Sequence, residues 1–262
     1  MPQLKLPPLS ASVSDLLDAA TTVFRMTLAK TMPVALFAML LAALPNLYWL
    51  TTGKPMDFRH PPLDPRFWAL TVVGLMCYQF LSAMLMLRQR AMLDGEAPDR
   101  AREAAAALRR WPMLIATYVL VGGVAVLLGA LLLSLRSMAV LAAALLVAPT
   151  VYLIVCFLLM RPVVLFEAGG PLQLVRRCVQ LGRTMWIKVM AAAVIAALVA
   201  FVCVVAAAAC LGVAQAVAVD LGAPVAAMNA VAATCELGVQ AVALVYFNAL
   251  WLVLYSAASS SA

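Results

Sequence analysis

Long stretches of this chain carry no charged side chain, and this feature restricts the fold more than any other. Asp, Glu, Lys and Arg are absent from 31–53, 67–87, 111–135, 137–160 and 189–219, and Glu236 is the one charged residue after position 220. An apolar helix needs about 20 residues to cross the hydrocarbon core of a bilayer. We therefore expect an all-α, polytopic membrane protein with six transmembrane helices, forming one integral membrane domain over 1–262.

Composition points to the same class and away from enzymes. Hydrophobic residues make up 66% of the chain and charged residues 11%, whereas soluble domains have about half and a quarter. The single histidine is His60, and no paired acids, Ser/His or Cys/His arrangement stands out. The sequence thus predicts a non-enzymatic protein with no cofactor and no metal.

The basic residues are distributed unevenly about the predicted spans. Fourteen of the 18 Lys and Arg residues fall before the first span, after the second or after the fourth. Loops rich in Lys and Arg stay cytoplasmic, so we expect a bacterial cytoplasmic (inner) membrane protein with both termini inside. Its basic face should meet anionic lipid headgroups, at roughly 1 kcal/mol per well-placed residue. Dispersal of these charges over three short segments disfavours nucleic acid as a partner.

An amphipathic segment precedes each pair of spans. Such segments begin near Ser14, Pro98 and Pro171 and show apolar residues at i, i+3, i+4 and i+7; the second has Glu103 on its polar face. We expect three cytoplasmic-side interfacial helices, each leading into a transmembrane hairpin. The chain can be divided into a three-fold repeat over about 11–94, 97–160 and 170–257, although any six-span protein with both termini inside resembles one. The predicted interfacial and anionic-lipid contacts are Arg102, Arg109, Arg110, Arg176, Arg177, Arg183, Trp186 and Lys188.

The connection between the fourth and fifth spans carries a local motif. Arg161 and Pro162 are followed by Glu167, Gly169 and Gly170, and then by a basic helix that ends at an aromatic residue. This segment resembles the signature of a broad bacterial group of six-helix membrane proteins, which includes the membrane domain fused to some glycerophosphoryl diester phosphodiesterases. The resemblance implies a fold and a membrane location. It implies no activity, because those phosphodiesterases owe theirs to a separate soluble catalytic domain.

Helix-end chemistry explains the motif without a ligand. A carboxylate such as Glu167 near a helix start is favoured by about 0.3–1 kcal/mol through the helix dipole. The two glycines allow a sharp change of direction between helices. We therefore favour a structural role for the motif.

Glu236 is the second feature that sequence alone singles out. At 1.5 Å per residue it lies about 18 Å along the last span, near the middle of the bilayer. A charge there costs about 2.5–3.5 kcal/mol, and such residues often mark pathways. Gln240 and Asn229 share its helix face, and Gln79 and Gln215 are predicted to reach toward it from the second and fifth spans. Either these groups form a proton- or cation-coupled path, or they hold the bundle together by hydrogen bonds.

Two functions from different classes follow. The leading hypothesis is a membrane scaffold that engages anionic lipid or a partner protein, and a homo-oligomer is left open. The alternative is a small transporter or channel that uses Glu236. An intramembrane lipid-modifying enzyme is the weakest hypothesis, because the catalytic groups it needs are missing from the sequence.

Overall fold

The computed structural model describes residues 6–8, 10–52, 64–134, 157–220 and 224–260. These ranges contain helices and no strand. Each of the five long helices includes a segment that is long and apolar enough to cross a membrane. The expectation of an all-α, multi-pass membrane protein is confirmed at this level. The helices are α1 (Val13–Thr51), α2 (Pro65–Leu93), α3 (Arg100–Ser134), α5 (Pro171–Asp220), α6 (Val225–Ser259) and the short apolar helix Phe157–Phe166.

Part of the predicted organisation concerns residues that the structure does not describe. Most of the fourth expected span, 137–160, lies outside the described residues, as does most of the loop 51–66. The middle pair of spans can therefore not be compared with the expected hairpin, and the three-fold repeat stays a prediction.

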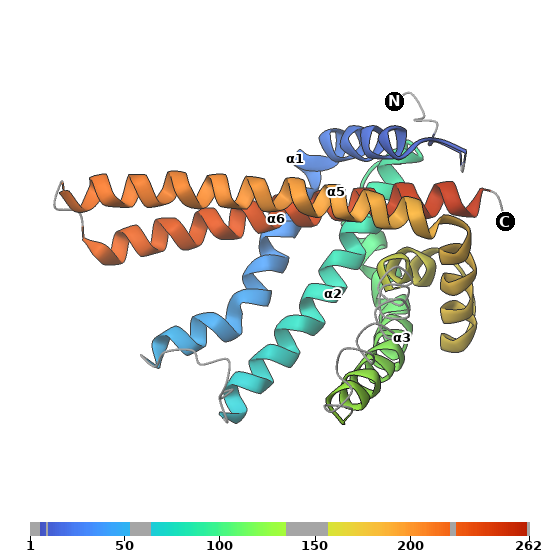
Figure 1. Cartoon of the computed structure of the whole chain (residues 1–262), viewed down its shortest axis with the longest axis horizontal. Helices are drawn as coiled ribbons and strands as arrows, with labels where there is room; N and C mark the ends of the chain where they lie inside the picture. The colour runs from blue at the N-terminus through green and yellow to red at the C-terminus, as the bar shows by residue number, and fades with distance from the viewer. Residues whose placement is uncertain (1–5, 9, 53–63, 135–156, 221–223, 261–262) are drawn as a thin grey trace.

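Consecutive helices pack against each other where both are described. The lower part of α1 runs beside α2, and α5 and α6 form a long antiparallel pair that extends away from the other helices (Figure 1). The C-terminal half of α6 also contacts α1 and α2. Its residues Leu250, Leu252 and Leu254 are fully buried, so this half of α6 lies at the centre of the molecule.

Local capping signals set the beginnings of α1 and α2. The backbone N–H of Ser12 donates to Asp15 Oδ2 at 2.9 Å, and the N–H of Asp15 donates to Ser12 Oγ at 3.2 Å. This reciprocal pair is a capping box, so the capping residue is Ser12, two residues before the expected Ser14, and α1 begins at Val13. Asp64 caps α2 by accepting from the N–H of Arg66, with proline at the first helical position.

A Schellman motif ends α2 and directs the chain into α3. Gly95 adopts a φ of 78°, a left-handed conformation that favours glycine. The N–H of Gly95 donates to the carbonyl of Met92, and the N–H of Glu96 donates to that of Ala91. Asp99 then accepts from the N–H of Ala101 at 2.9 Å and caps α3. This turn places the beginning of α3 beside the end of α2.

The first and third amphipathic segments each bury a row of apolar side chains inside the protein, although Leu172 and Trp186 of the third are exposed. Leu16 and Ala20 of α1, and Leu174 and Leu181 of α5, are almost completely buried in one core cluster with the end of α6. Their amphipathicity is therefore used in helix packing within the molecule. The expectation that these segments are interfacial helices on the cytoplasmic side stays a prediction.

The two segments continue into their spans in different ways. In Figure 1 the first part of α1 lies across the top of the molecule, and the helix then changes direction. Pro33 lies inside α1, and proline removes a helical hydrogen bond and bends a helix. By contrast, α5 is one helix of 50 residues from Pro171 to Asp220. Its basic first part is thus a coaxial extension of the span, without a sharp turn between them.

The second amphipathic segment is rotated relative to the prediction. Glu103, expected on the polar face, is buried and accepts from Arg88 Nε at 2.8 Å and Nη2 at 2.6 Å. Arg88 Nη1 also donates to the backbone carbonyl of Lys30 at 3.1 Å. This ion pair joins α1, α2 and α3. As a result the apolar side chain of Leu108, on another face of α3, is exposed.

Helices α1 and α2 approach closely at Gly74. This residue is buried, and a Cβ atom built on it would lie 2.6 Å from the backbone oxygen of Leu41. Only glycine fits such a distance without movement of α1.

Candidate functional site

A cluster around Arg161 connects α2, α6 and the short helix Phe157–Phe166. Arg161 Nη1 donates to Ser82 Oγ at 2.6 Å and to Asn248 Oδ1 at 3.0 Å, and Nη2 donates to Gln79 Oε1 at 2.8 Å. Ser82 and Asn248 are themselves buried. Among the interactions of the described residues, no carboxylate contacts Arg161. A cation is therefore held by neutral oxygens that belong to predicted spans.

Sequence reasoning missed this cluster because Arg161 follows a long apolar stretch and was assigned to a cytoplasmic loop. Its side chain instead reaches Gln79 and Ser82, which lie in the charge-free stretch 67–87. The available signal was the spacing of Gln79 and Ser82, because polar residues at i and i+3 lie on one face of a helix and can bind the same partner.

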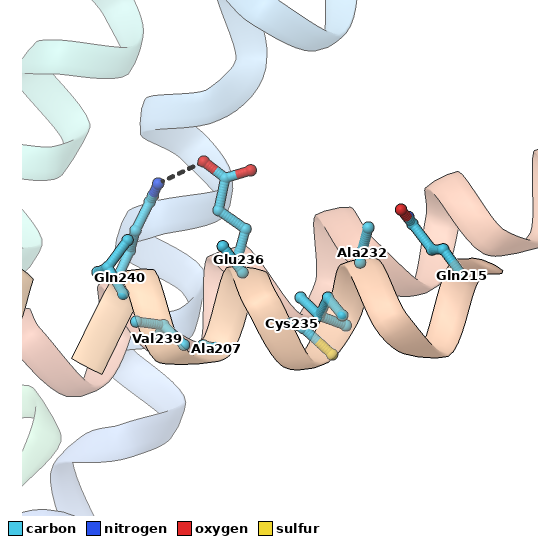
Figure 2. Close-up of a pocket in the computed structure, with 11 residues that line it drawn as sticks. Ala207, Gln215, Ala232, Cys235, Glu236, Val239 and Gln240 are labelled. Carbon is cyan, nitrogen blue, oxygen red and sulfur yellow. Dashed lines mark hydrogen bonds between the residues drawn. The ribbon is translucent and has the colours of Figure 1, made fainter. Parts of the chain in front are cut away.

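Glu236 lies in a groove between α5 and α6. The groove has a volume of about 440 Å³, and Glu236 is exposed in it. Gln240 Nε2 donates to Glu236 Oε1 at 3.0 Å, and both side chains point to the same side of α6 (Figure 2). Gln215 reaches the groove from α5. The remaining lining is apolar or small: Val204, Ala207, Ala208, Leu211, Gly212, Ala232, Cys235 and Val239.

The groove unites three of the five residues assigned to an intramembrane path. Gln215, Glu236 and Gln240 line it together. Gln79 does not, since its amide oxygen accepts from Arg161. Asn229 belongs to α6, but its side chain is outside what the structure describes. A polar path through all five is thus not assembled by the described residues.

A second groove, of about 540 Å³, lies along α3 and carries three arginines. Arg102 and Arg109 are seven residues apart and so share one face of the helix, and Arg110 lies beside them. Arg102 pairs with Glu96 at 3.2 Å in an exposed ion pair. Arg109 and Arg110 make no ion pair with any described residue. The groove is completed by Leu87, Ala105, Ala106, Met113 and Leu165.

The basic residues of α5 fall into two groups. Arg176 and Arg183 are exposed, as is Trp186. Arg177 Nε lies 3.1 Å from Glu167 Oε2, and Lys188 Nζ donates to the carbonyl of Ala11 at 2.8 Å. These last two cations therefore contact the protein itself.

The Glu167 motif links the short helix Phe157–Phe166 to α5 and α6. Besides Arg177, Glu167 accepts from the hydroxyl of Tyr255 on α6 at 3.3 Å. Gly169 and Gly170 form the link, and the N–H of Gly170 donates to Gln173 Oε1 at 3.1 Å, which caps α5. The contacts of the motif are those of a helix junction.

Metal-binding chemistry has no support in the described ranges, where no group of three His, Cys, Asp or Glu side chains is close enough to hold an ion. His60 lies outside them.

The fold and these polar sites define a multi-pass helical membrane protein. Comparison with known proteins adds no closer assignment: no family model matches the chain, and no curated protein or solved structure is detectably similar to it.

Proposed function

We propose that this chain is a non-enzymatic protein of a bacterial cytoplasmic membrane that binds anionic phospholipid on its cytoplasmic side. The single observation that carries the proposal is the α3 groove, where two arginines that make no ion pair with any described residue line the same groove as apolar side chains. Arg109 and Arg110 supply positive charge, and Leu87, Met113 and Leu165 supply apolar contact area. A phospholipid combines the same two chemistries, a phosphate and hydrocarbon. Binding of this kind suits a membrane scaffold or a protein that recruits a partner to the inner leaflet.

The orientation of the protein belongs to the same proposal. The beginning of α1 and the end of α6 lie on the same side of the molecule, opposite the end of α5 and the beginning of α6 (Figure 1). This arrangement is compatible with both termini in the cytoplasm, as the distribution of Lys and Arg predicts. The resemblance of the Glu167 segment to the six-helix membrane domains fused to phosphodiesterases stays a prediction, and it supports fold and location alone.

Native mass spectrometry of the full-length protein tests the lipid proposal. The protein is extracted in mild detergent and titrated with phosphatidylglycerol or phosphatidylcholine. We expect retained adducts with phosphatidylglycerol. The R109Q/R110Q double variant should lose about 2 kcal/mol of this binding, roughly thirtyfold, at ~1 kcal/mol per basic residue.

The matched control is the R176Q/R183Q variant, which removes the same charge from exposed sites outside the groove. It should keep the most tightly retained adduct. Equal retention of both lipids by the unmodified protein would contradict the proposal, as would full retention by R109Q/R110Q.

A small transporter or channel is the second candidate function. It is favoured by the groove that brings Glu236, Gln240 and Gln215 together. Flux of protons and monovalent cations into proteoliposomes, compared between the native chain and E236Q, tests it. Flux that is absent, or is unchanged by the substitution, would remove this candidate.

A further inference from the structure

The groove between α5 and α6 has the features of a ligand site, and we propose that it binds a lipophilic organic cation with Glu236 as the counter-charge. This site lies between α5 and α6, whereas the proposed lipid site lies along α3. The inference therefore does not depend on lipid binding at α3. It also requires no transport, since it concerns equilibrium binding at Glu236.

The size and lining of the groove fit a small organic molecule. Small-molecule sites occupy about 300–1,000 Å³ and are mostly apolar, with a few placed polar groups. This groove measures about 440 Å³. Its walls are formed by aliphatic residues such as Val204, Leu211 and Val239, and its polar groups are limited to one carboxylate and two amides.

The charge of the groove selects a cation. None of its lining residues is Lys or Arg. The carboxylate of Glu236 is held in place by Gln240 through Oε1, whereas no described residue donates to Oε2. A carboxylate on an apolar membrane helix is costly unless it is paired. A cation bound beside Oε2 would supply the missing partner.

The same groups argue against an inorganic ion as the occupant. Ca²⁺ takes six to eight oxygen ligands, and Mg²⁺ requires nearly octahedral coordination. One carboxylate and two amide side chains supply at most four oxygens, so water would have to fill the rest of either coordination shell in a largely apolar groove. The aliphatic walls have no role for a bare ion, but they match the hydrocarbon surface of a quaternary ammonium or phosphonium compound.

Equilibrium dialysis with tetraphenylphosphonium tests the proposal on the purified full-length protein in detergent. We expect saturable binding to the native chain. The E236Q variant should bind about tenfold more weakly, equivalent to ~1.4 kcal/mol, because it keeps the shape of the side chain and removes its charge. Triphenylphosphine oxide, which is uncharged, should bind weakly to both proteins.

Two variants separate the groove from its surroundings. E96Q removes an exposed carboxylate near the start of α3 and should bind like the native chain. A207F keeps Glu236 but fills the apolar wall next to it, and it should weaken binding. Thermal melting of each variant without ligand checks that the fold is retained.

Several results would overturn the inference. They are equal binding of tetraphenylphosphonium by the native chain and E236Q, equal binding of the charged and uncharged compounds, and displacement by submillimolar Ca²⁺ or Mg²⁺. The first would leave Glu236 as a side chain hydrogen-bonded to Gln240 without a ligand. Loss of phosphatidylglycerol retention would bear on the α3 groove alone, and loss of ion flux would bear on transport alone.

Discussion

Replacing Glu103 with glutamine removes the carboxylate that neutralises the buried guanidinium of Arg88. The two side chains are only 6% and 4% exposed, and both Nε and Nη2 of Arg88 donate to the same oxygen of Glu103. Breaking a buried pair by removing one partner costs about 3–5 kcal/mol, because the other charge stays buried. Glutamine keeps a neutral oxygen as an acceptor, so we expect E103Q to lower the free energy of unfolding by about 3 kcal/mol.

Reversible unfolding in mixed detergent and SDS micelles measures this change. The matched control is E96Q, which breaks the Arg102–Glu96 pair in the same region. That pair is 76% and 53% exposed at a distance of 3.2 Å, and exposed pairs contribute about 0–1 kcal/mol. E103Q should therefore be clearly less stable than E96Q.

The double variant R88M/E103L adds a second test of the same reasoning. It removes both charges and replaces them with apolar side chains, which is often neutral for a buried pair. Its stability should lie closer to that of the native chain than to that of E103Q. If E103Q costs no more than E96Q, or if the double variant is as unstable as E103Q, the pair is not the buried junction that the geometry indicates.

Two further predictions use the same unfolding measurement. G74A should destabilise the protein by about 1–3 kcal/mol through overpacking, because its Cβ would lie 2.6 Å from the backbone oxygen of Leu41. The control G122A has nothing within 4 Å of its Cβ, so it should be neutral or more stable by up to ~1 kcal/mol through helix propensity. Equal effects of the two substitutions would exclude close contact as the cause. R161M should lower the free energy of unfolding by about 1.5–3 kcal/mol, because hydrogen bonds to the guanidinium are lost and the oxygen of Gln79 is left without its donor. Native-like stability of R161M would show that the cluster does not hold these helices together.

The positions of the long helices could be predicted because hydrophobicity is a local property. A charge-free stretch of 20 or more residues shows its character without knowledge of its neighbours. The described spans follow the stretches 31–53, 67–87, 111–135 and 189–219, and the last span includes Glu236. Helix beginnings were nearly as accessible, since a capping residue acts within three positions of itself.

Side-chain partners were not predictable in the same way. Arg88 and Glu103 each stand among other charges in the sequence, so both were assigned to the wet surface. Their burial depends on the rotation of α3 against α2, a tertiary property that periodicity does not determine when alanines occupy two faces of a helix. The local pattern of α3 placed Glu103 on the polar face, whereas the ion pair with Arg88 fixes a different rotation.

In the candidate sites, too, local contacts could be predicted from the sequence and long-range contacts could not. Glu236 and Gln240 are four residues apart, so their contact followed from helix geometry. Gln215, which was also expected near them, lines the same groove from α5. Gln79 was also expected there, but Arg161 binds its oxygen. Depth and helix face can place a polar group in a layer of the membrane, but a competing partner from a distant segment decides which site it joins.

The structure also changes what the basic face can offer to lipid. A count of Lys and Arg treats every cation alike, but Arg88, Arg161, Arg177 and Lys188 direct their charged groups to the protein itself. Glu103 and Glu167 neutralise Arg88 and Arg177. Arg161 and Lys188 keep their charge but direct it to neutral oxygens of the protein. Electrostatic attraction to the leaflet falls off within a Debye length, so it depends on cations that remain at the surface. Arg109 and Arg110 keep their charge beside an apolar groove, and for this reason we expect lipid binding to be local, at α3, more than spread over the whole face.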